Sequence, residues 1–450
     1  MEGKDVRLDL ATFQVQDIVF SQSTGFSNGI LSVSKEELRQ LVLSDNHFID
    51  VEVDLARPGD KTRIINILDV VEPRHKVSGP GTVFPGLLGP PVTVGSGRTH
   101  RLRGMALVAT GEPAPGEAVH WRDGIIDMWG TGARYTPFSS IINLVLRLKG
   151  KVDFSPAEQS ALDMVDVIDG SSYAQEYNRA ARAAGFRVAD YLASVTRELD
   201  PEEVEVYELT PVDAALPRVA YACQLHLNRW LYGEKVGWQP TLLHPNEMLD
   251  GAVFSSFMGP ANSRDTSYIY QNHPIVRELY RRHGVDVNFL GLLLWFYGRT
   301  AVVEKERILG FGVKLLTMLG VNGVVMTWIG DGHSGVDIMM LCQKCENAGM
   351  KTVMLSPEMA LTPDDPGFVH FVPEADAIVS TGNYEMKLIL PAPDQVLGGT
   401  TLSVPQVDAS GSLSLSLRYL YASTSPLRYG KLAGVEKKHA PGPSKLYSGV

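Results

Sequence analysis

The sequence predicts an α/β protein with a β-rich N-terminal domain, a helical bridge and a doubly wound parallel-sheet domain. Its 450 residues exceed what one core usually holds, so we expect two or three domains. In the second half, near-continuous apolar runs alternate with helical patterns, which is typical of buried parallel strands joined by right-handed crossovers. The predicted division is a β-rich domain over 1–150, a helical bridge over 151–205, a Rossmann-like domain over 206–400 and a C-terminal extension or tail over 401–450.

Short apolar runs in the N-terminal domain predict strands and one capped helix. Ser34, followed by Glu36 and Glu37, is a favourable start for a helix over 34–43. Residues 48–55 alternate between apolar and acidic side chains, which is the pattern of a half-buried strand. Further strands are expected at 6–10, 14–20, 30–33, 63–71 and 103–110.

Two glycine-rich segments of this domain carry arginine and hydroxyl groups. The first, within a predicted loop over 79–102, runs from Gly95 to His100, and the second spans 127–139. Backbone N–H groups can converge on an anion where no Cβ intrudes, so each segment suits an anion or carboxylate site. One interpretation is that both segments face one concave site. For the first segment, the alternative is a simple turn into the next strand.

The bridge and the second half alternate between helices and strands. The pair Ser155-Pro156 is a typical helix start, and the Ala-rich pattern continues to 199. Strands are then expected at 218–225, 289–296, 323–329, 351–355 and 375–380, with helices at 302–319 and 335–349. Ligands of such sheets bind beyond the carboxyl ends of strands, where the segment 330–335 lies. We expect 410–421 to add one or two strands, and 423–450 to be a loosely held tail or an arm on a partner.

Composition describes a globular protein of the cytoplasm. Hydrophobic residues make up 44% of the chain and charged residues 20%. The net charge of −10 disfavours nucleic acid as a partner, because phosphate binding needs a basic face. The longest apolar run, 289–297, is about half of what a bilayer span needs, and no secretory signal is visible. Three cysteines do not form a disulfide framework.

Metal and redox chemistry are weaker interpretations of two clusters in the second half. Asp331, His333 and Asp337 have ligand-type side chains at the end of a strand, but their spacing matches no established motif, and helix capping explains Asp331 equally well. We therefore predict no metal site. Cys342 and Cys345 lie inside a predicted helix rather than at its start, where the dipole would activate a thiol, so packing is the simpler interpretation.

The most unusual stretch runs from 247 to 274. An apolar run ends at Gly259-Pro260, and a polar tract follows from Asn262 to His273. A hydrophobic core does not ordinarily select such a series of different hydrogen-bonding groups. The alternative is a long surface connector with turn residues.

The order of motifs along the chain resembles the component B precursor subunit of glycine/sarcosine/betaine reductase. The similarity is collinear over about residues 5–400. It rests on VEPRHKV at 71–77, VGSGRTHRL at 94–102, GIIDMWGTGARYTPFS at 124–139, PTLLHPNEMLDGA at 240–252, TSYIYQNHPIVRELYRRHG at 266–284 and KERILGFGVKLLTMLG at 305–320. In that family, the precursor cleaves itself at an internal cysteine, which becomes a pyruvoyl group. The substrate amine forms a Schiff base with it, and a selenol or thiol of a partner subunit then attacks the activated carbon.

This chain departs from the family at the cleavage region. The family has an Asn-Cys pair there and a second cysteine four residues on, and the register places these two cysteines at Met258 and Asn262. No cysteine lies between 224 and 341. Ser255, Ser256 and Ser263 are near, but none occupies the cleavage position. We therefore expect an uncleaved chain without a pyruvoyl cofactor, in which Met258 marks the family's cofactor position.

The resemblance implies a subunit that acts with a thiol- or selenol-bearing partner on a small, anionic substrate. Arg98, Thr99, His100, Arg134 and Tyr135 would hold the anionic group. Asn262, Tyr268, Gln271 and His273 would meet the reacting atoms. Two alternatives remain, namely a non-catalytic assembly subunit and an independent enzyme that uses Asp331 and His333 with a metal.

Overall fold

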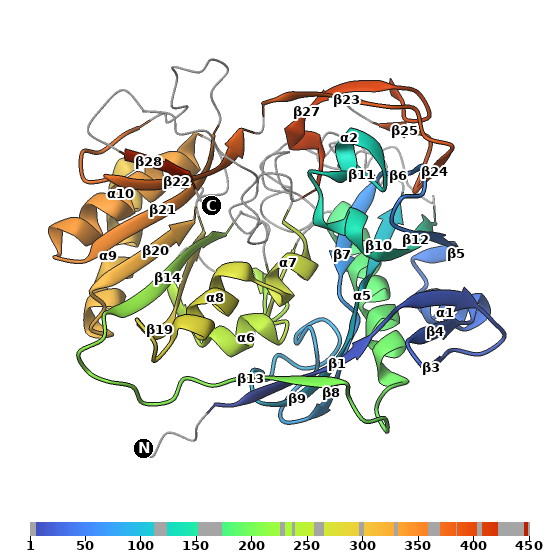
Figure 1. Ribbon diagram of the computed structural model, residues 1–450, viewed down its shortest axis with the longest axis horizontal. Coiled ribbons are helices and arrows are strands. Elements are labelled where there is room, and N and C mark those ends of the chain that lie inside the picture. The colour runs from blue at the N-terminus through green and yellow to red at the C-terminus, as the bar shows by residue number, and fades with distance from the viewer. Residues whose placement is uncertain are drawn as a thin grey trace.

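The computed structural model is a mixed α/β protein in which two groups of sheets face each other across buried helices (Figure 1). It describes residues 6–111, 124–151, 173–225, 230–235, 239–255, 265–296, 301–327, 332–358, 370–383, 385–402, 407–421 and 445–448. The predicted fold class is confirmed at this level. The predicted boundaries at 150, 205 and 400 stay predictions.

Two four-stranded sheets form the core of the N-terminal half. The first has the order β13 (Glu203–Tyr207), β1 (Leu8–Gln14), β9 (Gly97–Arg103) and β8 (Arg74–Ser78). The second has the order β5 (Phe48–Ala56), β12 (Ile142–Gly150), β10 (Met105–Gly111) and β7 (Ile67–Val71). Each sheet contains one parallel pair, β1 with β9 and β10 with β12.

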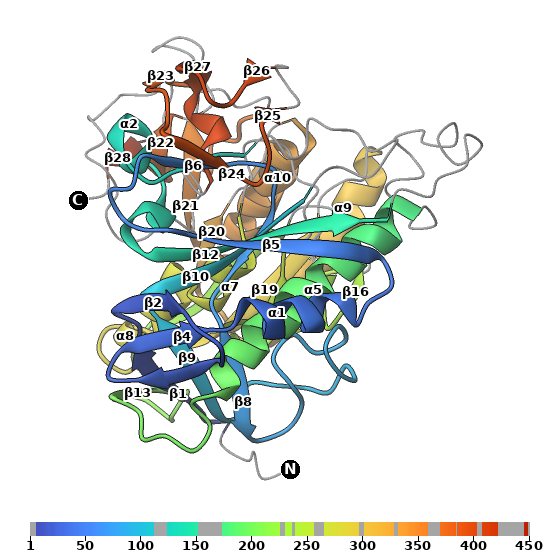
Figure 2. The ribbon, with the colours of Figure 1, turned by 90° about the vertical axis from the view of Figure 1, so that its right-hand side faces the viewer.

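Helices α1 (Lys35–Leu43) and α5 (Tyr173–Ser194) cover the outer face of the second sheet (Figure 2). The predicted cap of α1 is confirmed, since the Ser34 hydroxyl accepts a hydrogen bond from the Glu37 N–H at 3.3 Å. The predicted helix over 155–199 is seen from Tyr173, while 152–172 lie outside the described residues. Strand β10 is buried on both faces, because its inner face packs against the C-terminal half.

Smaller sheets and short helices complete the N-terminal half. The small sheets are β2 (Asp17–Phe20), β4 (Ile30–Val33) and β3 (Gly25–Ser27); β11 (Ile126–Asp127), β6 (Thr62–Ile64) and β24 (Gln395–Leu397); and β16 (Glu234–Lys235), β15 (Trp230–Leu231) and β18 (Val253–Phe254). The short helices are α2 (Gly130–Ala133), the 3-10 helix η2 (Pro137–Ser140) and α6 (Pro245–Leu249). The predicted strand over 63–71 is divided into β6 and β7, because Asn66 adopts a left-handed conformation with φ of 52°.

The C-terminal half is built on a seven-stranded sheet. Its order is β17 (Thr241–Leu243), β19 (Asn288–Phe296), β14 (Arg218–Leu225), β20 (Gly323–Thr327), β21 (Lys351–Glu358), β22 (Ala377–Asn383) and β28 (Lys445–Ser448). All neighbouring strands are parallel except β17, which is antiparallel to β19. The chain order reverses at β14, which lies between β19 and β20, as in doubly wound folds.

Helices cover the two faces of this sheet unequally. One face packs against α9 (Val302–Met318) and α10 (His333–Asn347) in a core that includes Ala220, Met326 and Met354. On the other face, β14 and β19 share a core with α7 (Ser267–Gln271) and α8 (Pro274–Arg282). The same core contains Val70, Val108 and Val145 of the N-terminal sheet, so it joins the two halves.

Residues from 385 to 421 return to the N-terminal half (Figure 1). They form β23 (Lys387–Leu390), β25 (Thr401–Leu402), β26 (Val407–Asp408), β27 (Leu413–Ser416) and the 3-10 helix η3 (Leu417–Tyr419). Arg63 holds this segment, because its guanidinium donates to the carbonyls of Pro391, Ala409 and Gly411. It also forms a two-point ion pair with Asp127 at 2.7 and 3.0 Å, and both side chains are fully buried.

We predict that Arg63→Met lowers the free energy of unfolding by about 3–5 kcal/mol, because it leaves the buried Asp127 carboxylate without its cation. Arg39→Ala is the matched control, since its ion pair with Asp50 is exposed and removing it should cost less than about 1 kcal/mol. Urea denaturation followed by circular dichroism measures both. Equal losses in the two variants would contradict the role assigned to Arg63.

Candidate functional site

The polar tract from Asp265 to His273 is buried between the two halves of the protein, contrary to the expectation that no core would select it. Its residues form α7 and the start of α8 rather than a surface connector. Here the core accepts polar side chains because partners far away in the sequence satisfy their hydrogen bonds. Asn262 and Met258 belong to 256–264, outside the described residues, and their predicted roles stay predictions.

Arg74 and Glu72 of the N-terminal half form hydrogen bonds with the end of α7. The Glu72 N–H donates to the Gln271 side-chain oxygen at 2.9 Å, and the Gln271 amide donates to the Glu72 carbonyl at 3.1 Å. The Arg74 guanidinium pairs with the Glu72 carboxylate at 2.7 Å. It also donates to the Gln271 carbonyl at 2.9 Å, to the Asn272 side chain at 3.3 Å and to the Leu249 carbonyl. Gln271, predicted to be catalytic, thus has a side chain that binds backbone.

Asp69 on β7 holds the start of α7. Its carboxylate accepts hydrogen bonds from the Ser267 N–H at 2.9 Å and from the Ser267 hydroxyl at 2.5 Å. The Ser267 oxygen in turn accepts from the Ser255 N–H at 3.0 Å. Arg182 of α5 lies 3.9 Å from the carboxylate, while burial raises the pKa of Asp69. Ser255 and Ser267, which flank the segment 256–264 in the sequence, are therefore in contact beside Asp69.

His273 lies fully buried at the N-terminus of α8. Its Nδ1 accepts from the Val276 N–H at 3.5 Å, which leaves the proton on Nε2, 3.3 Å from the Tyr221 hydroxyl. That hydroxyl lies 2.7 Å from the Thr327 hydroxyl on β20. Burial lowers the pKa of His273 to about 3, so the ring is neutral at physiological pH. Its contacts are those of a helix cap; its predicted catalytic role stays a prediction.

A cavity of about 510 Å³ opens beside Tyr268 and Asn272, between the N-terminal strands and α8. Arg134, which the sequence singled out, lines it together with Tyr268, so the structure brings two predicted site residues together. The other lining residues are Gln14, Glu72, Arg103, Gly104, Thr136, Pro137, Ser140, Ile141 and Arg277. The buried Thr136 hydroxyl has no hydrogen-bond partner among the described residues, which leaves it available to a ligand.

Three arginines and one carboxylate line this cavity, and Glu205 pairs with two of the arginines, Arg103 at 3.6 Å and Arg277. Arg103, Arg134 and Arg277 line it, and its one carboxylate, Glu72, is already paired with Arg74. Arg277 is held by Glu205, at 2.9 and 3.1 Å. Burial alone would raise the pKa of Glu205, but Arg101, Tyr207 and Arg277 hold it at about 2. The cavity therefore suits a small anion, for which arginine provides a two-point donor.

The residues Arg98, Thr99 and His100 do not reach this cavity. Instead of a loop they form part of β9, whose alternation sends their side chains to different places. Arg98 is exposed and lies 3.7 Å from Asp9, and the buried His100 ring lies 3.1 Å from the Thr196 hydroxyl. Burial lowers the pKa of His100 to about 4. Tyr135 packs beside the cluster of β23 and β27.

The first glycine-rich segment does receive a carboxylate, but it is the protein's own Asp250. This side chain accepts hydrogen bonds from the Gly95 N–H at 2.8 Å, from the Thr99 hydroxyl at 2.6 Å and from Lys76. Gly95 has a φ of 100°, and a Cβ there would lie 2.9 Å from the Glu247 nitrogen. The predicted carboxylate chemistry is present, yet it serves to pack 245–250 against the first sheet.

Of the three side chains that could bind a metal, Asp337 is engaged by another residue of the protein. Asp337 is buried in α10 and forms an ion pair with Lys305 of α9. Among the described residues, no group of three metal-ligating side chains comes together. Asp331 lies outside the described residues.

The family's pyruvoyl position lies outside the described residues, and the expectation that this chain forms no such group stays a prediction. The precursor of this group is a cysteine, and the three cysteines of this chain are all buried elsewhere. Cys342 and Cys345 lie in α10, where burial raises the pKa of their thiols to about 11 and 12. These raised values also fit packing residues rather than an activated dithiol.

Sequence reasoning missed Glu72, Asn272, Thr136 and Arg277 as site residues. Asn272 belongs to the polar tract and Glu72 to the motif at 71–77, so both stood within stretches already noted. Thr136 lies in the second glycine-rich segment and Arg277 in the motif at 266–284, but neither was singled out there, because only the tertiary structure places them at the cavity.

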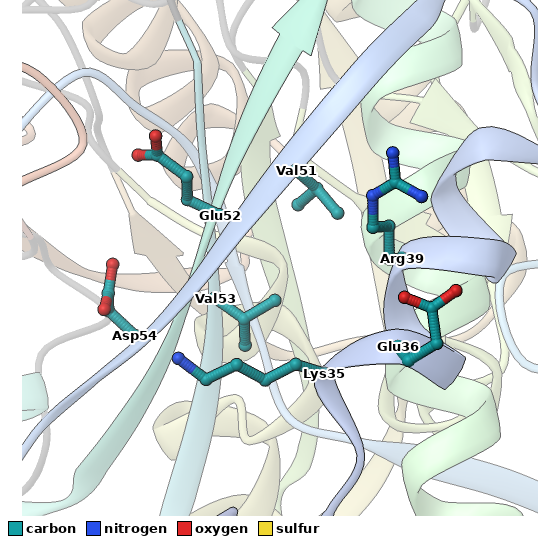
Figure 3. Close-up of a pocket in the computed structure, with 7 residues that line it drawn as sticks. All are labelled: Lys35, Glu36, Arg39, Val51, Glu52, Val53 and Asp54. Carbon is teal, nitrogen blue, oxygen red and sulfur yellow. The ribbon is translucent and has the colours of Figure 1, made fainter.

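A second hollow, on the far side of the molecule, is a charged surface groove of about 400 Å³ (Figure 3). It lies between α1 and β5, and two of its charged side chains form ion pairs. Arg39 binds Asp50, while Glu52 binds Arg147 and Lys149. None of the charged side chains that line it is buried, so we do not treat it as a site.

Comparison with known proteins places the chain among reductase subunits. The family model for glycine/sarcosine/betaine reductase component B subunits matches residues 6–420. The glycine reductase complex component B subunits alpha and beta of Acetoanaerobium sticklandii are 32% identical over 451 residues, covering 95% of this chain and 99% of that protein. No solved structure matches significantly.

Two further relatives come from Peptoclostridium acidaminophilum. The sarcosine reductase complex component B subunit alpha is 33% identical over 450 residues, covering 95% of this chain and 99% of the relative. The betaine reductase complex component B subunit alpha is 35% identical over 415 residues, covering 87% of this chain and 88% of the relative. No helix within the described part of the chain is long and apolar enough to cross a membrane.

We predict that the buried, neutral His273 makes stability fall as the pH falls from 7 to 5. Its pKa of about 3 in the folded chain lies below the ordinary value of about 6.5, so the unfolded chain gains the proton first. This group alone should remove about 2 kcal/mol of unfolding free energy over that range. Urea denaturation at both pH values measures the loss. His273→Asn, which keeps a capping oxygen but does not titrate, should lose about 2 kcal/mol less, and equal losses would contradict the prediction.

Proposed function

The chain belongs to the family of glycine/sarcosine/betaine reductase component B subunits, and from that premise we propose that it acts with a thiol- or selenol-bearing subunit. The reaction proposed is the reductive cleavage of a carbon–heteroatom bond, of the C–N type, in a small anionic substrate. The cavity beside Tyr268 carries this proposal, because it combines three arginines with an unpartnered buried hydroxyl. Tyr268, which lines the cavity, follows shortly after 256–264 in the sequence, and the family forms its cofactor in that segment.

In the proposed mechanism the cavity orients the substrate for attack from outside. Arg134 binds the substrate carboxylate through two parallel hydrogen bonds, and the Thr136 hydroxyl donates a further one. The Tyr268 side chain lies beside the remaining polar atoms, while the Asn272 amide is held by Arg74 and by the Tyr268 carbonyl. This geometry fixes the carbon that bears the leaving group, so that a bimolecular attack is held in one orientation.

The bond changes occur between the substrate and the partner. The thiolate or selenolate forms a bond to the carbon, the carbon–nitrogen bond breaks, and its electron pair leaves with the nitrogen, which ends protonated. A second thiol, supplied as the reductant, then attacks the bound sulfur or selenium. The bond to carbon breaks, the carbon leaves with the electron pair and takes up a proton, and a disulfide or selenenyl sulfide remains for reduction by a further thiol. Since the chain lacks the pyruvoyl precursor, we propose that the substrate enters with its leaving group already activated.

A non-catalytic assembly subunit is the second candidate. The side chains of Gln271 and His273 bind groups of the protein itself, and the cleavage cysteine is missing. Both observations are what a fold retained for assembly would show. The two candidates differ in whether the cavity contributes to turnover.

We predict that Arg134→Ala and Thr136→Val each lower kcat/KM by about 10- to 100-fold in the complex with the thiol-bearing subunit, because each removes one hydrogen-bonding group from the substrate carboxylate. Sarcosine and betaine, named for the relatives, and small activated carboxylates are the substrates to assay. Arg98→Ala is the matched control, since this exposed arginine lies outside the cavity. Unchanged turnover in both cavity variants, in a complex that is active, would favour the assembly subunit.

We predict that the purified chain gives one species near 49.2 kDa in intact mass spectrometry under denaturing conditions. Cleavage of the family type requires a cysteine at the cleavage position, and this chain has no cysteine between 224 and 341. Two fragments of roughly half that size would show that another residue performs the processing. Treatment with hydroxylamine, which reacts with a protein-bound carbonyl, then identifies the new N-terminal group by its mass shift.

A further inference from the structure

One face of the seven-stranded sheet is only partly covered. The side chains of Tyr221 and Leu292, on β14 and β19, lie in the core under α7 and α8. The strand register places Val325 beside Tyr221 and Val353 beside Val325, so all three point to the same face. Val325 and Val353 are nevertheless half-buried, whereas their neighbours on the opposite face, under α9 and α10, are buried. The apolar surface of β20 and β21 is therefore open.

A groove of about 1180 Å³ lies over this open surface. Its apolar floor consists of Val219, Val325, Val353 and Leu355, and we call these residues the open face. One wall is α8, and the other is formed by four consecutive residues, 205–208, which include Val206 of β13. Within the described part of the chain β13 is an edge strand that pairs with β1 alone, so its other side can accept another strand.

Most charged side chains of the groove walls form ion pairs. Arg277 pairs with Glu205 at 2.9 Å, and Arg281 pairs with Glu278 at 2.5 Å. Arg282 pairs with Asp286, four residues on. Among the described lining residues only the Glu208 carboxylate has no ion pair, so the walls carry too little charge to select a strongly acidic or basic partner. An apolar, uncharged polypeptide segment matches the floor best.

The groove and the candidate cavity meet. Asn272 and Arg277 line both. A group that lies along the groove therefore ends beside the place where a substrate would be held. The groove is also larger than the cavity by more than a factor of two, which suits a chain segment rather than a small molecule.

We propose that the open face is the docking site of the thiol- or selenol-bearing subunit. An extended apolar segment of that subunit lies along the groove beside β13 and directs its reactive sulfur or selenium toward Asn272. This inference rests on the proposed function for the identity of the partner. It goes further in assigning the surface that the partner uses.

Binding of the purified thiol-bearing subunit to the full chain, measured by biolayer interferometry, tests this assignment. Leu355→Glu and Val353→Asp should each weaken the affinity at least tenfold, because they place a carboxylate on the apolar floor. Val206→Glu should also weaken the affinity, and because Val206 is already 47% exposed, this substitution leaves the fold intact. Ile389→Glu and Ile49→Glu, at 71% and 56% exposure on β23 and β5, are the matched controls and should bind as the wild type does.

Raising the salt concentration from 50 to 500 mM should change the affinity less than threefold, since the proposed contact is apolar and its wall charges are paired. Wild-type affinity in all three groove variants, or a steep loss of affinity with salt, would overturn the assignment. A dimer of the isolated chain that Leu355→Glu converts to a monomer would assign the groove to a second copy instead.

The two proposals fail separately. If Arg134→Ala turns over normally while the groove variants lose binding, the cavity is wrong and the docking surface stands. If the cavity variants lose turnover while the groove variants bind normally, the docking surface is wrong. Absence of any binding by the wild type at 100 µM, on the order of the weakest specific complexes, would overturn both the docking surface and the partner.

Discussion

The buried guanidinium of Arg74 is the interaction on which the centre of this protein depends. It pairs with Glu72 and donates to three acceptors at the ends of α6 and α7, namely Leu249, Gln271 and Asn272. A charge removed from water is stable only when its partners are complete, so this cluster permits one arrangement of the two halves. The flanking apolar core would tolerate several packings, whereas the fork of an arginine fixes distances and directions.

Helix α7 illustrates the consequence. Five residues are too few to form a stable helix in isolation, since nucleation costs more than one turn returns. Asp69 holds its first residue and the Glu72–Arg74 pair holds its last, and both anchors belong to the N-terminal half. Tyr268 is thereby placed at the cavity wall. A binding site requires side chains that are held rigidly, and the buried hydrogen bonds and ion pairs provide this support. The same interactions hold together the two halves, which share one hydrophobic core.

One glutamate likewise connects α8 and β13. Glu205 binds both Arg101 of the first sheet and Arg277 of α8, and it thus connects the wall of the cavity to the wall of the groove. A segment that displaced β13 or shifted α8 would disturb both spaces together. The cavity and the groove share Asn272 and Arg277, so the proposed substrate site and the proposed docking surface would be linked through common side chains rather than through a distant pathway.

Local patterns in the sequence determined much of the secondary structure, because caps and periodicity depend on near neighbours. The alternation over 48–55, the Ser34 cap and the apolar runs of the parallel sheet were all readable in that way, and Arg134 was identified from its glycine-rich surroundings. The resemblance to component B subunits likewise followed from motif order. Only the tertiary structure decided that the polar tract is buried, because the backbone that bonds to the Gln271 side chain lies 199 residues earlier in the chain. It also decided that Thr99 meets Asp250 rather than a ligand, since a carboxylate supplied by the protein and one supplied by a substrate require the same donors.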